Sequence, residues 1–110
     1  MDIASIQKHL REFAKDRDWE QYHNPKNLAM ALTVEAGELQ ELFQWLTPEE
    51  SQQVKFDSNC AAEEIADVFL YLARIADVLD IDIGDAVAMK LQKNANKYPA
   101  EGSNTPRSIR

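Results

Sequence analysis

Two pairs of acidic side chains occupy positions at which a helix would otherwise be apolar. Glu35 and Glu38 form the first pair, and Glu64 and Asp67 form the second. Steps of three and four residues put each pair beside apolar side chains of its own helix. These apolar rows contain Leu28, Leu32, Leu39, Leu42 and Leu46 around the first pair, and Val68, Tyr71, Ile75 and Val78 around the second.

Four carboxylates gathered away from water raise one another's pKa values unless a cation compensates their charge. Ligands made only of oxygen suit the hard ions Mg²⁺ and Mn²⁺. The pattern therefore predicts a divalent-metal site, and its alternative is an ordinary acidic helix surface. A di-iron carboxylate bundle is a weaker alternative, because it needs Glu-x-x-His on paired helices and the only histidines are His9 and His23.

Basic and hydrogen-bonding side chains gather near the end of the last predicted helix. The acid-free stretch between Asp85 and Glu101 holds three lysines on one face and two polar neighbours. These residues are Lys90, Lys93, Lys97, Asn94 and Tyr98. Such side chains could bind phosphate oxygens, and the alternative is a solvated basic helix end that the helix dipole favours.

Aromatic side chains cluster on either side of the first acidic pair. Trp19, Tyr22 and His23 precede its helix, Trp45 stands at its predicted end, and Tyr71 shares a row with Glu64. Aromatic rings beside a phosphate site could stack on a nucleobase. Their alternative role is as core residues and loop anchors.

The elements that position these residues are predicted to be helices, since the chain has only 3 Gly and 4 Pro. Capping signals predict a helix from residue 3 to about 17, one from 25 to about 46, a short one after 47, one from about 59 to 79, and one from 82 that ends before Pro99. In the helix from 59 to 79, the residues expected to face inward are Ile65, Val68, Phe69, Leu72, Ile75, Ala76 and Leu79.

The predicted fold is all-α, a four-helix bundle that forms one domain over residues 1–99 and is followed by a flexible tail over 100–110. Each helix carries a broad apolar stripe, so we expect a second subunit to complete the bundle. At 110 residues the chain buries roughly two-thirds of its unfolded surface, which is enough for one core.

Charge and composition exclude several other classes of protein. The 12 basic and 19 acidic residues give a net charge of −7, which makes a nucleic-acid polymer a poor partner. The negative charge is concentrated between residues 35 and 82. The single cysteine, Cys60, fits a reducing cytosol. We expect a cytoplasmic protein without a membrane partner, because the sequence shows no signal-peptide layout and no apolar run of about 20 residues.

Three segments in order resemble the all-α nucleoside triphosphate pyrophosphohydrolases of the MazG type, and among these the dCTP pyrophosphatases. The segments are RDWEQYHNPKNLAMALTVEAGELQELFQWL, AAEEIADVFLYL and KLQKNANKYP, and the likeness spans about residues 5–99. The resemblance implies Mg²⁺ ligands at Glu35, Glu38, Glu64 and Asp67. It implies a nucleobase and sugar pocket formed by Trp19, Glu20, Gln21, Tyr22, His23 and Trp45. It also implies a substrate contact at Tyr71 and phosphate contacts at Asn94, Lys97 and Tyr98.

The resemblance further implies hydrolysis between the α- and β-phosphates of dCTP or a 5-modified dCTP, a role in nucleotide-pool sanitation, and a homodimer or dimer of dimers. Glu41, one turn beyond Glu38, is a candidate to orient or deprotonate the attacking water, with a plain surface glutamate as its alternative. Some relatives place a histidine where this chain has Leu10. Two alternative functions stay open: a non-catalytic helical dimer that acts as a binding module, and a nucleotidase or dUTPase-like enzyme that cuts elsewhere.

Overall fold

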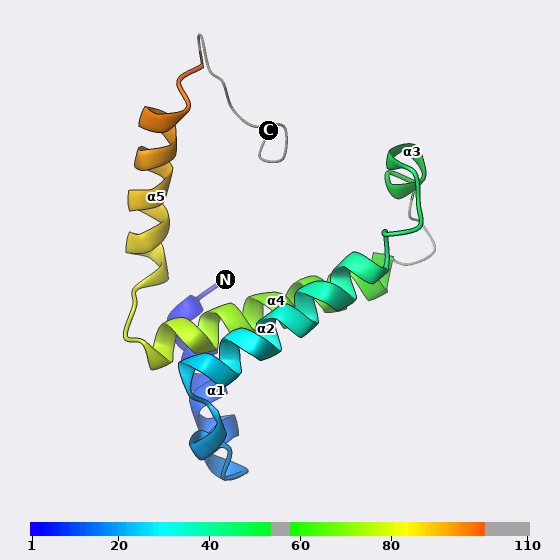
Figure 1. Cartoon of the computed structure of the whole chain (residues 1–110). Coiled ribbons are helices and arrows are strands. Elements are labelled where there is room, and N and C mark those ends of the chain that lie inside the picture. Colours follow the sequence, from blue (N-terminus) through cyan, green and yellow to red (C-terminus); the bar gives the residue numbers. More distant parts are fainter. Residues whose placement is uncertain (54–57, 101–110) are drawn as a thin grey trace. The chain divides into compact units, whose positions relative to one another are not determined.

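The computed structural model describes residues 1–53 and 58–100, and helices are its regular elements. They are α1 (Ile3–Asp16), the 3₁₀ helix η1 (Glu20–Tyr22), α2 (Pro25–Glu41), α3 (Pro48–Ser51), α4 (Ser58–Val78) and α5 (Ile83–Lys97) (Figure 1). No strand occurs among the described residues, so the predicted all-α class is confirmed. The chain divides into two compact units, residues 1–80 and 81–110, and α5 is the helix of the second.

The predicted starts of α1, α2, α3 and α5 are confirmed, and each of these helices has a local cap. The side chains of Asp2, Asn24 and Asp82 each accept a hydrogen bond from the backbone N–H three residues later. Thr47 and Glu50 form the reciprocal capping box that opens α3. The α4 and α5 bounds also agree with the predicted ranges within a residue or two.

The end of α1 turns the chain so that Trp19 folds back over the helix. Asp18 adopts φ 57°, the left-handed conformation common just after a helix C-terminus. The N–H of Trp19 donates to the carbonyl of Ala14 at 2.8 Å, and the N–H of Asp18 donates to that of Lys15 at 3.1 Å. This pair of bonds is the Schellman arrangement, which brings the residue after the turn against the last turns of the helix. The Trp19 ring accordingly meets the Phe13 ring edge-on, with centroids 5.7 Å apart.

The second long helix is shorter than predicted, because α2 ends at Glu41 and not near Leu46. The N–H groups of Leu42 and Phe43 donate to carbonyls three residues back, at 3.3 and 2.9 Å, so the chain tightens into turns. The extended backbone of Thr47, which opens the capping box of α3, also requires the helix to stop. Trp45 therefore lies beyond the helix that carries the first acidic pair.

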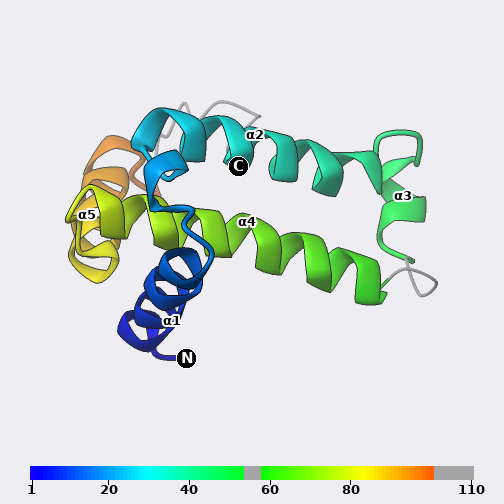
Figure 2. The ribbon, with the colours of Figure 1, turned by 90° about the horizontal axis from the view of Figure 1, so that it is seen from below.

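The packing of the first unit centres on α4. Helix α2 lies alongside α4 in the opposite direction, and α1 packs against the C-terminal half of α4 (Figure 2). Leu28 is 2% exposed and Ala73 is 0% exposed, so a small residue of α4 lets its neighbours approach closely. The Gln7 side chain also donates to the carbonyl of Ala73 at 2.9 Å, which fastens α1 to α4.

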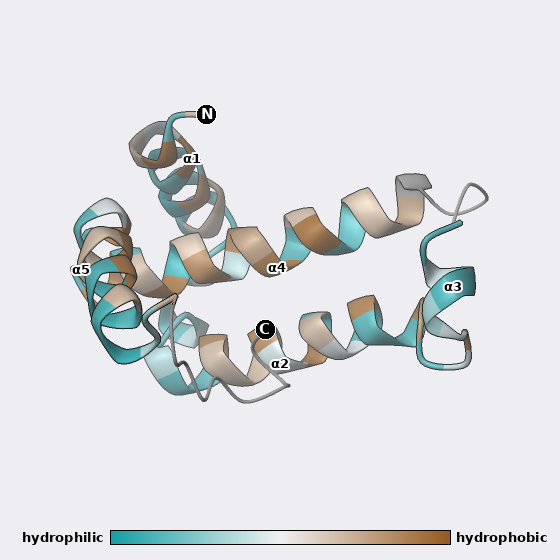
Figure 3. Cartoon of the chain, turned by 90° about the horizontal axis from the view of Figure 1, so that it is seen from above, coloured by the Kyte–Doolittle hydropathy of each residue, from teal (hydrophilic) through white to brown (hydrophobic). Residues whose placement is uncertain are grey.

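The inward face predicted for α4 is partly wrong. Ala76 is buried and Val68, Phe69 and Ile75 are half-buried, but Ile65, Leu72 and Leu79 are exposed. The reason is geometric: α1 and α2 cover only part of the circumference of α4. Apolar stretches follow both α2 and α4 (Figure 3), and Met30 and Val34 of α2 are also exposed.

No described helix is long and apolar enough to cross a bilayer. The predicted single domain over 1–99 stays a prediction. The predicted tail begins at Ala100, and its remaining residues, 101–110, lie outside the described residues.

Candidate functional site

A cluster of carboxylates lies between α2 and α4. Glu35 of α2 and Glu64 and Asp67 of α4 each place one carboxylate oxygen within 4.8 Å of the others. The side-by-side packing of the two helices brings these residues together from positions about 30 apart in the sequence. Three of the four residues that the sequence singles out as metal ligands are thus neighbours in space.

The cluster has the polarity of a cation site. Glu35 Oε2 and Glu64 Oε2 are buried, and no described residue makes a hydrogen bond to either atom. A buried oxygen without a partner is costly, so such atoms call for a compensating group. A hard divalent cation with oxygen ligands fits this donor set, because carboxylate oxygens are the ligands that Mg²⁺ and Mn²⁺ prefer.

The pKa shifts within the cluster also favour a cation site. Removal from water raises the pKa of Glu35, and a hydrogen bond with Glu38 and the charges of Glu38, Asp67 and Glu64 raise it further. Removal from water likewise raises the pKa of Glu64, followed by the effects of Glu38, Asp67 and Glu63. Ionisation of both carboxyl groups is therefore less favourable here than in water, and a bound cation would favour it.

The remaining acids of α2, Glu38 and Glu41, are exposed. Glu38 is exposed, yet it lies close enough to Glu35 and Glu64 to raise the pKa of both. Glu41 is the last residue of α2 and is exposed. Its suggested role toward water stays a prediction.

A cavity of about 190 Å³ opens beside the cluster. Its lining residues come from α1, from the segment after it, and from α4, and they are Leu10, Phe13, Trp19, His23, Asp67, Leu70, Tyr71 and Arg74. Trp19 stands between two other rings, with centroids 5.7 Å from Phe13 and 6.2 Å from His23. The wall is mainly aromatic and aliphatic, with a few polar groups, which is the usual character of a small-molecule site.

Asp67 belongs to both features. It contributes an oxygen to the carboxylate cluster and a part of the cavity wall. Tyr71 follows one turn later on α4, and Arg74 follows one turn after that. A single helix face therefore leads from the candidate metal site into the aromatic cavity.

A partly buried hydrogen-bond network lies at the far end of this face. Arg74, which is 9% exposed, donates from Nε to Nδ1 of His23 at 3.1 Å and from a terminal nitrogen to Asp77 at 3.2 Å. The other oxygen of Asp77 pairs with Arg11 of α1 at 2.6 Å. Burial lowers the pKa of His23, and the charge of Arg74 lowers it further.

Other residues suggested for the base pocket lie outside the cavity lining. Glu20, Gln21 and Tyr22 form the exposed helix η1, where the Gln21 amide donates back to the Asp18 carbonyl at 3.2 Å. Trp45 is 87% exposed in the turns after α2. Their suggested roles stay predictions.

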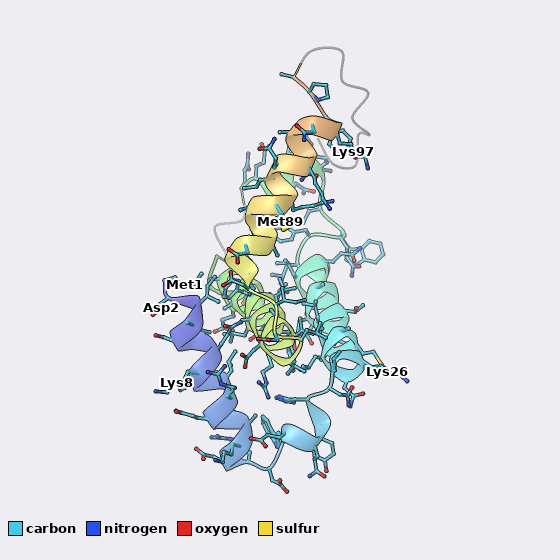
Figure 4. All side chains as sticks on the ribbon, turned by 90° about the vertical axis from the view of Figure 1, so that its left-hand side faces the viewer. Met1, Asp2, Lys8, Lys26, Met89 and Lys97 are labelled. Atoms are coloured by element: carbon cyan, nitrogen blue, oxygen red, sulfur yellow. The ribbon has the colours of Figure 1, made fainter. Side chains whose placement is uncertain are left out.

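The suggested phosphate-binding residues all belong to the second unit. Lys90, Lys93, Asn94 and Lys97 lie on α5, and Tyr98 follows its last residue. Lys97 is labelled near the end of α5 in Figure 4, and its Nζ lies 5.3 Å from the centroid of the Tyr98 ring. Their role toward phosphate stays a prediction.

Sequence reasoning did not select Arg74 or Phe13 as site residues. The sequence does contain an indication for Arg74. It is one of the few basic residues between residues 35 and 82, and it follows Asp67 and Tyr71 at helical spacing. Phe13 stands at helical spacing from Leu10 in the first helix. Its place in the cavity depends on the return of the chain at Asp18, which spacing within α1 does not reveal.

Comparison with known proteins gives concordant results. The model of the MazG-like family matches residues 30–107. The chain is 42% identical over 101 residues to dCTP pyrophosphatase 1 of Homo sapiens and 40% identical over 100 residues to that of Bos taurus. These alignments cover 89% and 88% of this chain and 59% of each relative, so the chain spans about three-fifths of their length.

A solved structure is similar over most of both chains. It is the crystal structure of a pyrophosphatase from Archaeoglobus fulgidus, which is 42% identical to this chain with a TM-score of 0.82. The likeness covers 87% of this chain and 91% of the archaeal one.

Proposed function

Because this chain belongs to the MazG-like family, we propose that it is a magnesium-dependent nucleoside triphosphate pyrophosphohydrolase. It would cleave between the α- and β-phosphates and release a nucleoside monophosphate and pyrophosphate. Mn²⁺ would substitute for Mg²⁺, because the two ions share a preference for oxygen ligands.

The shared position of Asp67 is the observation that carries this proposal. A triphosphate that is held at the carboxylate cluster would have its nucleoside part beside the aromatic cavity, because Asp67 lines both. The buried oxygens of Glu35 and Glu64 that lack partners support a cation at the same place.

Each group of residues has a distinct role in this proposal. Glu35, Glu38, Glu64 and Asp67 would hold the ion. When bound, Mg²⁺ supplies positive charge against the phosphate oxygens and makes water a better nucleophile. Glu41 would orient or deprotonate that water. In phosphoryl transfer most of the catalysis is positioning and charge stabilisation, so the protein has little covalent chemistry to perform.

The nucleoside would occupy the aromatic cavity, with Trp19 and Tyr71 against the base. We propose dCTP or a 5-modified dCTP as the substrate and nucleotide-pool sanitation as the role. The names of the human and bovine relatives support dCTP. Lys90, Lys93, Asn94, Lys97 and Tyr98 would bind phosphate oxygens. The exposed apolar side chains of α2 and α4 support a homodimer or a dimer of dimers.

The test is a panel of nucleoside triphosphates incubated with Mg²⁺, with products separated by chromatography. We expect dCMP and pyrophosphate from dCTP. We expect a loss of at least 100-fold in Glu64→Gln, whereas Glu63→Gln, which removes the same charge from an exposed neighbour, keeps its activity. Release of dCDP and phosphate would favour a nucleotidase. No release from any nucleotide by wild type would favour the non-catalytic module.

A further inference from the structure

We propose that Arg74 is a positioning residue that fixes the tautomer of His23, so that His23 offers an Nε2–H donor to the occupant of the cavity. The cavity would then prefer a base edge with an acceptor, such as N3 of cytosine, over an edge with a donor, such as N3–H of uracil or thymine. This base preference rests on the proposed function, since it takes the occupant to be a nucleobase, whereas the tautomer of His23 does not depend on that function.

The chemistry of the two side chains leaves one assignment. A guanidinium group has five N–H donors, no acceptor, and keeps its charge in proteins. Because Arg74 Nε lies 3.1 Å from Nδ1 of His23, Nδ1 must supply the lone pair. The imidazole is therefore neutral and carries its proton on Nε2. A ring turned over by 180° would place a C–H group against the Arg74 donor and would lose this bond.

The position of Arg74 is itself fixed from two sides. The residue is nearly buried, and its terminal nitrogen lies 3.2 Å from Asp77 one turn later on α4. Asp77 is held in turn by Arg11 of α1 at 2.6 Å. With both ends of the guanidinium engaged, Nε stays directed at the ring. The neutral state that this bond needs is also favoured by burial, which lowers the pKa of His23.

His23 is well placed to use its remaining donor. It lines the cavity together with Trp19, and the hydrogen bonds of the described residues include none from its Nε2. Its own backbone N–H is bonded to the Glu20 carbonyl at 3.2 Å, so the ring is the part of the residue that is free to act. An N–H group on a mainly apolar wall is the kind of polar feature that gives a pocket its specificity.

A purely structural role for Arg74 makes different predictions. If Arg74 served only to fasten the segment after α1 to α4, its loss would lower stability and would weaken all nucleotides equally. Arg11 provides a matched control, because it also pairs with Asp77 but makes no contact with His23. The variants Arg74→Met and Arg11→Met each remove one guanidinium from the same carboxylate, and only the first releases the ring.

The tautomer is tested by ¹⁵N NMR of the imidazole groups in the full chain without metal or nucleotide. A His9→Gln variant assigns the two histidines. We expect only the Nε2–H form of His23 in wild type and in Arg11→Met, and a mixture with the Nδ1–H form in Arg74→Met. If Arg74→Met does not fold, Arg74→Lys and the wild-type spectrum still decide the question. An Nδ1–H form in wild type would overturn the proposal, as would an unmixed Nε2–H form in folded Arg74→Met.

The specificity is tested by the ratio of kcat/KM for dCTP to that for dUTP. We expect Arg74→Met to lower this ratio about tenfold, mainly through KM, and Arg11→Met to leave it unchanged. An equal loss for both nucleotides would overturn the specificity half and favour the structural role. If wild type hydrolyses neither nucleotide, the proposed function fails and the specificity half fails with it, whereas the NMR result stands by itself.

Discussion

Replacing Glu64 by glutamine should stabilise the protein without metal and weaken its response to Mg²⁺. Glutamine keeps the size of the side chain and removes its charge. The pKa of Glu64 is raised, first by removal from water and then by Glu38, so the ionised form opposes folding near neutral pH. A neutral side chain at this position removes that opposition. Most substitutions at half-buried positions destabilise a protein, and the opposite sign is therefore diagnostic.

The pH dependence follows from the same shift. Glutamate ordinarily titrates near 4.5, and its folded-state pKa here is higher. Below the ordinary value the carboxyl is protonated in both states, so wild type and Glu64→Gln should be about equally stable. As pH rises, the unfolded chain of wild type ionises first, and wild type loses stability until pH passes the raised pKa. The advantage of the variant should therefore grow over this window and then level off.

The response to metal can be given a magnitude. An ion present at about 100 times its Kd adds about 2.7 kcal/mol to the unfolding free energy. A variant that binds about 100-fold more weakly would gain only about 0.4 kcal/mol at the same concentration. For a domain of this size, roughly 4 °C of Tm corresponds to 1 kcal/mol. We therefore expect Mg²⁺ to raise Tm by roughly 10 °C in wild type and by about 2 °C in the variant.

The assay is thermal unfolding followed by circular dichroism, with EDTA and with Mg²⁺, from about pH 4 to about pH 8. Glu63→Gln is the control, because it makes the same charge change on the same helix at an exposed position that offers no ligand atom to the cluster. It should keep the wild-type response to Mg²⁺. The prediction is contradicted if metal-free Glu64→Gln is less stable than wild type near neutral pH, or if Mg²⁺ raises Tm equally in the two proteins.

Three further predictions concern the cavity wall and the turn that forms it. Asp18→Gly should stabilise the chain by up to about 1 kcal/mol and Asp18→Val should destabilise it by about 1–2 kcal/mol, because φ is 57° there. Urea unfolding measures both, and equal effects would contradict the role of the turn. The lowered pKa of His23 means that the unfolded chain takes up a proton first as pH falls through 6.5, so wild type should lose stability toward pH 5 and His23→Gln should lose less. A parallel decline in urea titrations of the two proteins would count against this. Trp19→Ala should raise KM for dCTP about tenfold or more and leave hydrolysis of inorganic triphosphate unchanged. An equal loss on both substrates, measured by pyrophosphate release from dCTP and by phosphate release from inorganic triphosphate, would remove Trp19 from the base site.

The sequence predicts helix starts better than helix ends in this chain. The starts of α1, α2, α3 and α5 depend on a cap within three residues, as at Asp2 and Asn24, and such a bond does not depend on the rest of the fold. The end of α2 lacks a local signal of this kind. The apolar row continues through Leu42 and Leu46, although the backbone has already tightened into turns after Glu41. Periodicity therefore extends the helix too far.

The carboxylate cluster and the cavity differ in the same way. Spacing along two helices is enough to pair Glu35 with Glu64 and Asp67, because long helices with apolar faces pack side by side. The cavity instead depends on a turn with a left-handed residue and on contacts between α1 and α4. Neither the Arg74–His23 bond nor the meeting of Phe13 and Trp19 follows from spacing within one helix.

The positions of the charged residues decide what the net charge of −7 implies for nucleotide binding. In the proposed function, the carboxylate cluster repels a triphosphate until a cation occupies it. The buried Arg74 offsets little of this repulsion, because it lies at the far end of the α4 face and is paired with Asp77 at 3.2 Å. The charge that changes when the ion binds is therefore that of the cluster, whose negative charge a divalent ion reduces by two. The ion would then decide which way a nucleotide enters, with its phosphates at Asp67 and its base toward His23. An enzyme of this design needs no excess of basic residues to handle polyphosphate.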